Sequence, residues 1–260
     1  PEFSMGRLLP PSGYSFSERV EMLENYFDKN HRYRTGDLKF DDKVLLISGM
    51  GKLKETDNPI QKFLEDNNLY TDESQISTSF KEDPKDLMEE YKELLGESHE
   101  FLFVNIHGGA SLQETEPING KVVDMYEDEI EEINPKVAVQ MLYSCNNADF
   151  SNENYFGGEM LFRGDTLVVL GHTSQIGVVE QEGEFIVPRK IMLNLLANGA
   201  SIGELQIDEW ATILGDPTLR FRDLSGTGSY IMPESGVVDM GEVMLNEEMI
   251  HGTESRKEIN

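Results

Sequence analysis

The chain has 260 residues, which is long enough to bury a full hydrophobic core, so we expect one domain with an appendage. Its formal net charge of −27 argues against a protein that binds nucleic acid or an anionic membrane surface. No segment approaches the roughly 20 consecutive apolar residues that a membrane-spanning helix needs, so we expect neither nucleic acid nor membrane among the partners.

The first residues bear on the compartment as well as on the fold. Pro1 to Ser4 precede Met5 and are typical of a cloning remnant, so we expect the domain to begin at Met5. The chain contains one cysteine, and the lack of an internal disulfide framework favours a reducing, cytoplasmic location. Secretion stays open, because a native signal peptide would be missing together with the native start.

The first predicted element is an amphipathic helix near the N-terminus. Ser17 is a suitable N-cap, and Val20, Leu23, Tyr26 and Phe27 follow it at helical spacing. These four side chains are therefore predicted to form the buried face of the helix.

The rest of the chain alternates between strand-like and helix-like segments. Further helices are predicted at 59–64, 84–95, 126–133, 155–162 and 188–197. Strands are predicted at 43–48, 75–80, 101–106, 137–145, 166–170 and 218–221. The strongest strands are apolar without alternation, as parallel strands buried on both faces are. The pattern predicts an α/β fold with a mostly parallel six-stranded sheet and helices on both faces. We expect this domain to span 5–225, followed by an acidic appendage and tail at 226–260.

Two of the predicted strands end on residues that are capable of covalent chemistry. The run 101–106 leads into His107, Gly108 and Gly109, and the run 137–145 ends on Cys145. Ligands of open parallel sheets bind beyond the carboxyl ends of the strands, so this histidine and this cysteine would share one rim. An imidazole that accepts the thiol proton turns cysteine into a nucleophile for acyl transfer. Spacing alone favours the simpler alternative, a small buried cysteine and a structural histidine.

Longer motifs favour the catalytic interpretation. They are Gly6-Arg-Leu-Leu-Pro10, His107-Gly108, Tyr143-Ser-Cys-Asn-Asn-Ala-Asp-Phe150, and Glu209-Trp210 with the following Gly215-Asp-Pro-Thr-Leu219. In this order they resemble segments of the gingipain-type cysteine peptidases, which share a clan with caspases, clostripain and legumain. The resemblance covers roughly residues 6–222. It implies a caspase-like three-layer sandwich and a cysteine endopeptidase.

The resemblance also implies roles for single residues. Cys145 is the nucleophile and His107 the general base and acid, while the backbone N–H groups of Gly108 and Cys145 are the oxyanion donors. Gingipains orient the histidine with an acidic residue, and Met50 stands at the matching place here. Glu55 or Asp57, in the same predicted loop, is a candidate substitute; a solvated loop residue and a helix cap are the alternatives for these two.

Substrate preference follows from the same resemblance. It implies cleavage after Arg or Lys, with Asp57 near the place where arginine-cleaving members carry their pocket carboxylate. The tryptophan that those members place after the fifth strand is absent, and His172 stands in this segment as a candidate pocket residue. A structural role is the commoner one for a histidine at a strand end.

The sequence also allows expectations about cofactors, partners and an alternative function. We expect no required cofactor, although Asp124, Glu127 and Asp128 leave a structural calcium ion open. The expected partner is a protein or peptide substrate, with processing or a regulatory protein controlling activity. The alternative is a catalytically impaired interaction module that keeps the fold, which is motivated by Met50.

Overall fold

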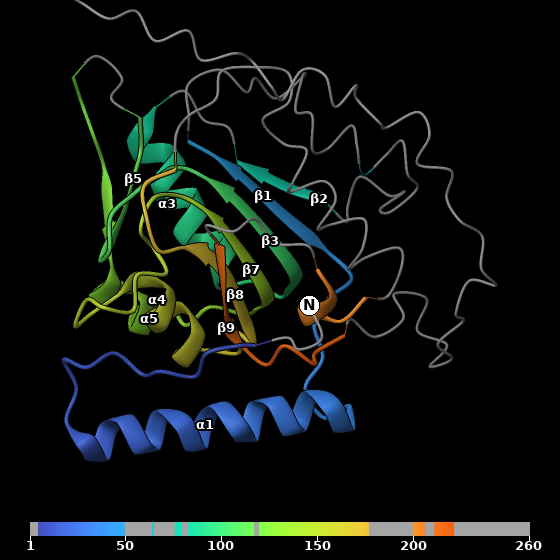
Figure 1. The fold of residues 1–260 in the computed structure, drawn as a ribbon. Coiled ribbons are helices and arrows are strands. Elements are labelled where there is room, and N and C mark those ends of the chain that lie inside the picture. Colours follow the sequence, from blue (N-terminus) through green and yellow to red (C-terminus); the bar gives the residue numbers. More distant parts are fainter. Residues whose placement is uncertain are drawn as a thin grey trace, which may run out of the picture. The chain divides into compact units, whose positions relative to one another are not determined.

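A computed structural model describes the fold, and Figure 1 shows its elements. The described residues are 5–49, 64, 76–79, 83–116, 120–176, 200–205 and 211–220. The chain divides into two compact units, Pro1–Gly228 and Ser229–Asn260, and all described residues belong to the first. Within the described part of the chain, no helix combines the length and the apolar character that a membrane crossing requires.

A six-stranded sheet with the strand order β2-β1-β3-β7-β8-β9 forms the centre of this unit (Figure 1). The strands are β1 (Val44–Ser48), β2 (Ile76–Ser79), β3 (His99–Asn105), β7 (Val137–Tyr143), β8 (Val168–His172) and β9 (Ala211–Gly215). Neighbours from β2 to β8 are parallel, and β9 is antiparallel to β8. Every residue of β1, β3 and β8 is buried, which agrees with their unalternating apolar sequences. The predicted α/β class and the mostly parallel sheet are confirmed.

The predicted strand at 218–221 is wrong for residues 218–220, the part of it that the structure describes. The chain turns there, because Gly215 adopts a left-handed φ of 111° and Pro217 has no N–H to donate to a ladder. Asp216 closes the turn by accepting the Thr218 N–H at 2.8 Å. The edge strand is β9, which immediately precedes this turn. Gly-Asp-Pro-Thr is a sequence that favours a turn, and this preference prevails over the strand preference of the apolar residues that follow.

Helix α1 (Phe16–Thr35) starts earlier than predicted. Ser15, not Ser17, is its N-cap, and Ser15 and Glu18 form a reciprocal capping box. Gly36, with a φ of 87°, ends the helix in the left-handed conformation. In Figure 1 the helix runs as a long rod beneath β8 and β9.

The predicted buried face of α1 is confirmed at two of its four positions: Tyr26 is buried, and Leu23 packs partly buried against the core. The prediction is wrong for Val20 and Phe27, which are 36% and 57% exposed. The helix also buries Met22, Lys29, Asn30 and Tyr33. This face mixes aromatic rings with polar groups whose hydrogen bonds are satisfied inside the protein, so a count of apolar residues at helical spacing misses it.

Helices α3 (Pro84–Leu95), α4 (Ile130–Ile133) and α5 (Phe156–Phe162) cover one face of the sheet. The described residues also form two 3-10 turns, η3 (Glu127–Glu129) and η5 (Ile202–Glu204), and η5 lies on the opposite face. With α1, the helices α3 to α5 pack against Leu45, Ile47, Leu102, Val104 and Leu142. The opposite face buries Leu46, Phe103, Met141 and Leu170 together with Leu64 and Ile202. The predicted helix at 188–197, and that at 59–64 apart from Leu64, lie outside the described residues.

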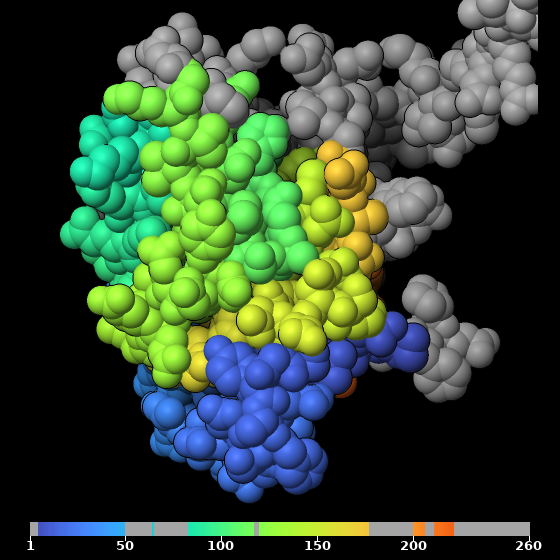
Figure 2. Space-filling model, turned by 90° about the vertical axis from the view of Figure 1, so that its left-hand side faces the viewer, coloured from blue at the N-terminus to red at the C-terminus, as the bar shows by residue number. Residues whose placement is uncertain are grey.

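A second, three-stranded sheet grows from the carboxyl end of β3. It consists of β4 (His107–Gly108), β5 (Leu112–Glu114) and β6 (Asp124–Tyr126), all antiparallel. This sheet is absent from the sequence-based prediction, because its strands are too short and too polar to show a periodicity. Figure 2 views the molecule from this side: the green surface of residues 107–116 and 120–126 adjoins the yellow-green surface that follows β7.

Candidate active site

The carboxyl ends of β3 and β7 bring His107 and Cys145 to one rim. The two strands are parallel neighbours, and Asn105 is the register partner of Tyr143. His107 and Cys145 each follow this registered pair at the same distance along their chains. Neighbouring strands lie about 4.8 Å apart, so the two segments leave the sheet side by side.

The turn between β4 and β5 determines where the Gly108 N–H points. The Gly109 N–H donates to the Leu112 carbonyl at 3.0 Å, and Gly108 faces Gln113 across the ladder. Hydrogen-bonded and non-hydrogen-bonded pairs alternate in an antiparallel ladder, so Gly108 and Gln113 form a non-hydrogen-bonded pair. The Gly108 N–H therefore points away from β5, where it can serve an external acceptor.

Gly108 packs directly against the segment that carries the cysteine. A Cβ at this position would lie 2.8 Å from the Cys145 carbonyl oxygen and 3.0 Å from the Ser144 Cβ. Only glycine permits this approach of the histidine hairpin to the cysteine loop.

Cys145 is a free, half-buried thiol whose polar contacts come from the segment after β8. The Ile176 N–H donates to the Cys145 Sγ at 3.4 Å, and the Ile176 carbonyl oxygen lies 3.6 Å from the sulfur. Between the described His107 and Cys145 side chains there is no hydrogen bond.

The loop after Cys145 is held against the end of β8. Asn146 adopts a left-handed φ of 55°, and its N–H donates to the Ser174 carbonyl at 3.1 Å. The Ala148 N–H donates to the His172 carbonyl at 3.0 Å. Asparagine tolerates the left-handed conformation better than most residues, so it suits this sharp turn directly after the thiol.

The remaining predicted site residues are only partly placed. His172 is 5% exposed, and its ring packs edge-on against Tyr143 with centroids 5.6 Å apart. The packing makes His172 part of the core below the rim. Met50, Glu55 and Asp57 lie outside the described residues.

The acidic residues proposed for calcium are described, and they do not form a metal-binding group. The Asp124 carboxylate accepts a hydrogen bond from the nearby Tyr126 hydroxyl at 3.1 Å. Glu127 and Asp128 belong to the 3-10 turn that follows. Across the part of the chain that the structure describes, no three His, Cys, Asp or Glu side chains are grouped as ligands of a metal ion.

Asn147 is the buried polar residue at the rim that sequence reasoning missed. It is fully buried, and its side chain makes hydrogen bonds to both the cysteine loop and the β4–β5 hairpin. Its place two residues after the predicted nucleophile is visible in the sequence, but an asparagine in a loop is more often a turn residue.

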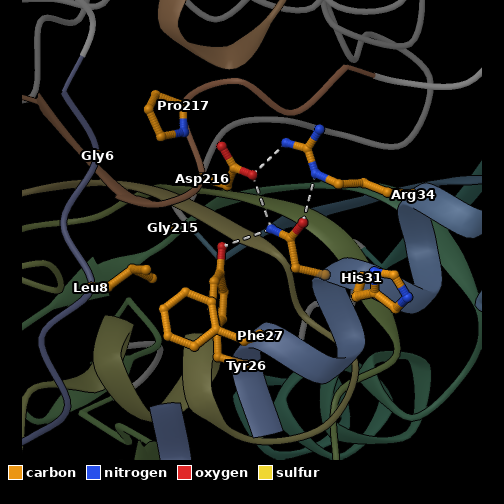
Figure 3. A pocket seen from close by; sticks show the side chains of 10 residues that line it. Gly6, Leu8, Tyr26, Phe27, His31, Arg34, Gly215, Asp216 and Pro217 are labelled. Carbon is orange, nitrogen blue, oxygen red and sulfur yellow. Dashed lines mark hydrogen bonds and ion pairs between the residues drawn. The ribbon is translucent and has the colours of Figure 1, made fainter. Parts of the chain in front are cut away.

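A separate hollow of about 410 Å³ lies between α1 and the turn after β9 (Figure 3). At its polar end, Asp216 accepts the Asn30 amide at 3.1 Å and forms an ion pair with Arg34. Burial acts to raise the pKa of Asp216, but the hydrogen bonds from Thr218, Arg34 and Asn30 outweigh it and hold the pKa below its usual value. None of the residues that line this hollow belongs to the rim of His107 and Cys145.

The first and the last of the gingipain-like motifs, Gly6–Pro10 and Gly215–Leu219, contact each other beside this hollow. The Arg7 N–H donates to the Ile213 carbonyl at 2.9 Å, and the Gly215 N–H donates back to the Arg7 carbonyl at 2.8 Å. A Cβ at Gly6 would lie 2.1 Å from the Gly215 carbonyl oxygen. These two motifs therefore stabilise the edge of the sheet.

Comparison with known proteins gives a likeness of fold. No protein-family model and no curated protein matches the sequence. Among solved structures, the Arg-specific cysteine proteinase gingipain R is similar with a TM-score of 0.52 and 16% identity, over 77% of this chain and 52% of that one. The complex of the pro- and mature domains of Porphyromonas gingivalis RgpB gives a TM-score of 0.53 and 15% identity, over 77% and 54%. The chain spans about half the length of each neighbour. The described fold is thus similar to that of the gingipain cysteine proteinases, consistent with a caspase-like fold.

Proposed function

We propose that the chain is a cysteine endopeptidase with Cys145 as nucleophile and His107 as general base and acid. The observation that carries the proposal is the register of β3 and β7, which sets both residues at equivalent positions on one rim. The likeness to gingipain structures, which are cysteine proteinases, supports the same reaction class.

The reaction begins when His107 accepts the Cys145 proton and the sulfur attacks the peptide carbonyl. A C–S bond forms, and the carbonyl oxygen becomes an oxyanion that accepts hydrogen bonds from the N–H groups of Gly108 and Cys145. His107 then protonates the amine while the C–N bond breaks. Water, deprotonated by His107, attacks the acyl-enzyme and releases the acid, and the proton returns to the Cys145 thiol.

The preferred substrate is a peptide with Arg or Lys before the cleaved bond. The net charge of −27 favours basic peptides, and one similar structure is that of an Arg-specific proteinase. The contact between Cys145 and the Ile176 backbone is the place where processing or a regulatory partner would change the access to the thiol.

A panel of fluorogenic peptides with Arg, Lys or Asp before the cleaved bond tests the proposal. We expect hydrolysis of the Arg or Lys peptide, and its loss in Cys145→Ala and His107→Ala. Hydrolysis that survives in both variants would refute the assignment. A folded wild type that cleaves none of the peptides, even after limited proteolysis, would favour the impaired interaction module.

A further inference from the structure

The side chain of Asn147 uses all of its hydrogen-bonding capacity inside the protein. Its Nδ2 donates to the Gly109 carbonyl at 2.6 Å and to the Leu112 carbonyl at 2.9 Å. Its Oδ1 accepts the Gln113 amide at 3.0 Å and the Ser144 hydroxyl. A primary amide has two donor hydrogens and an oxygen with two lone pairs, so no group of this side chain is left over.

These bonds join the two segments that carry the proposed catalytic pair. Gly109, Leu112 and Gln113 belong to the hairpin that begins with His107, while Asn147 lies in the loop that begins with Cys145. The Asn147 amide also lies 3.0 Å from the place of a Cβ on Gly108. One buried side chain therefore bonds the histidine hairpin to the cysteine loop.

The start of α5 supports the same junction through its backbone. The Gly157 N–H donates to the Asn147 carbonyl at 2.7 Å, and the Phe156 N–H donates to the Ala110 carbonyl at 2.7 Å. A Cβ at Gly157 would lie 2.8 Å from the Asn147 carbonyl oxygen. Successive N–H groups of one helix end thus hold the loop and the hairpin in place.

We propose that Asn147 is a positioning residue, which fixes the His107–Gly108 hairpin against the Cys145 loop. The inference rests on the proposed function, because it assigns Asn147 to the geometry of that catalytic pair. No other side chain of this size supplies both donors and acceptor: aspartate would turn a carboxylate toward two carbonyl oxygens, and alanine would remove both donors, leaving the Leu112 carbonyl with the Gly109 N–H as its partner.

The single cysteine of the chain allows a direct test, because iodoacetamide alkylation reports on Cys145 alone. The alkylation rate is measured against pH for the wild type, His107→Ala, Asn147→Ala and Asn147→Asp. We expect the profiles of both Asn147 variants to move toward that of His107→Ala, with an alkylation rate at neutral pH about tenfold below that of the wild type, because the imidazole no longer accepts the thiol proton efficiently.

Asn30→Ala is the matched control. Asn30 is also a buried asparagine whose amide bonds three side chains, Tyr26, Asp216 and Arg34, but it lies in α1 away from the rim. We expect this variant to keep the wild-type alkylation profile. If Asn147→Ala does not fold, Gln113→Leu, which removes one of the bonds to the hairpin, is expected to give a smaller shift in the same direction.

Hydrogen exchange separates the positioning role from the proposed reaction. We expect Asn147→Ala to accelerate exchange of the amides of residues 107–115 and to leave those of α1 unchanged. The inference would be overturned if the folded Asn147 variants kept the alkylation profile and the hydrogen exchange of the wild type. It would also be overturned if Asn30→Ala shifted the alkylation profile by the same amount. If wild type and His107→Ala alkylate alike, the proposed function fails, and unchanged hairpin exchange in Asn147→Ala would then overturn the positioning role as well.

Discussion

Gly108 approaches Cys145 so closely that a Cβ at position 108 would stand 2.8 Å from the Cys145 carbonyl oxygen. The added Cβ and the Cys145 carbonyl oxygen would both be fixed to the backbone in a tightly packed region. The contact can therefore be relieved only if the β4–β5 hairpin moves away from the Cys145 loop. We expect Gly108→Ala to lower kcat/KM for peptide hydrolysis by roughly 100-fold, because a displaced oxyanion donor costs about this much. The free energy of unfolding should fall by about 1–3 kcal/mol.

Gly109→Ala is the control for this substitution. The nearest atom to a Cβ at Gly109 is the Leu112 Cγ at 3.6 Å, an ordinary contact. This variant should keep its activity and its stability to within about 0.5 kcal/mol. Equal losses in the two variants would show that the close approach of Gly108 to Cys145 does not matter to the reaction.

Glu100 predicts a pH dependence of stability. Burial, and secondarily the charge of Asp42, raise the pKa of Glu100 from 4.5 to about 8, and its Oε2 has no hydrogen-bond partner among the described residues. The folded state binds this proton more tightly than the unfolded state, so the glutamate costs nothing below pH 4.5 and destabilises the fold increasingly as the pH rises to about 8. Glu100→Gln should therefore stabilise the protein at pH 8 by on the order of a few kcal/mol, and by much less at pH 4.5.

Urea denaturation at several pH values measures this difference. The exposed Glu93→Gln on α3 makes the same change of charge and should have little effect at any of them. A Glu100→Gln variant with the same pH dependence as the wild type would contradict the assignment of this proton to Glu100.

Asp216 should matter for stability and not for chemistry. It accepts the Asn30 amide and the Thr218 N–H, and it pairs with Arg34, all away from the rim. Asp216→Ala is expected to cost about 1–3 kcal/mol at pH 7 and to keep the wild-type kcat/KM well below the melting temperature. The pKa of this carboxyl lies below its usual value, so its contribution should be lost as the pH falls through the acid range.

Asp28→Ala is the matched surface control, since Asp28 is exposed and forms an ion pair with exposed Arg32 at 3.8 Å. It should change stability by less than about 1 kcal/mol. A fall in kcat/KM for Asp216→Ala without a loss of stability would place the Gly-Asp-Pro-Thr-Leu motif in the reaction, against the present account.

The main sheet could be predicted from the sequence because its central strands have a clear local sequence pattern. Strands β1, β3 and β7 are apolar on both faces, and each is followed by residues that end a strand. Residues that follow neighbouring parallel strands necessarily share an edge, so the common rim of His107 and Cys145 could be expected before their register was known.

The parts that could not be predicted depend on tertiary partners. Strand β4 exists because β3 continues into a hairpin, and two residues carry no periodicity. Lys29 is buried in α1 because its Nζ donates to the Leu161 and Gly164 carbonyls, which lie far away in the sequence. Asn147 is likewise defined by distant partners in the hairpin. A local pattern cannot reveal bonds of this kind.

Covalent labelling by an arginyl chloromethyl ketone, with lysyl and aspartyl analogues beside it, shows whether Cys145 and His107 act together as a peptidase pair. Because the chain has one cysteine, mass spectrometry can locate a single adduct on Cys145. We expect the arginyl or lysyl reagent to label Cys145 in the wild type, and His107→Ala to abolish the labelling. Equal labelling of wild type and His107→Ala, or no labelling of the folded protein by any of the three reagents, would contradict a Cys145–His107 peptidase.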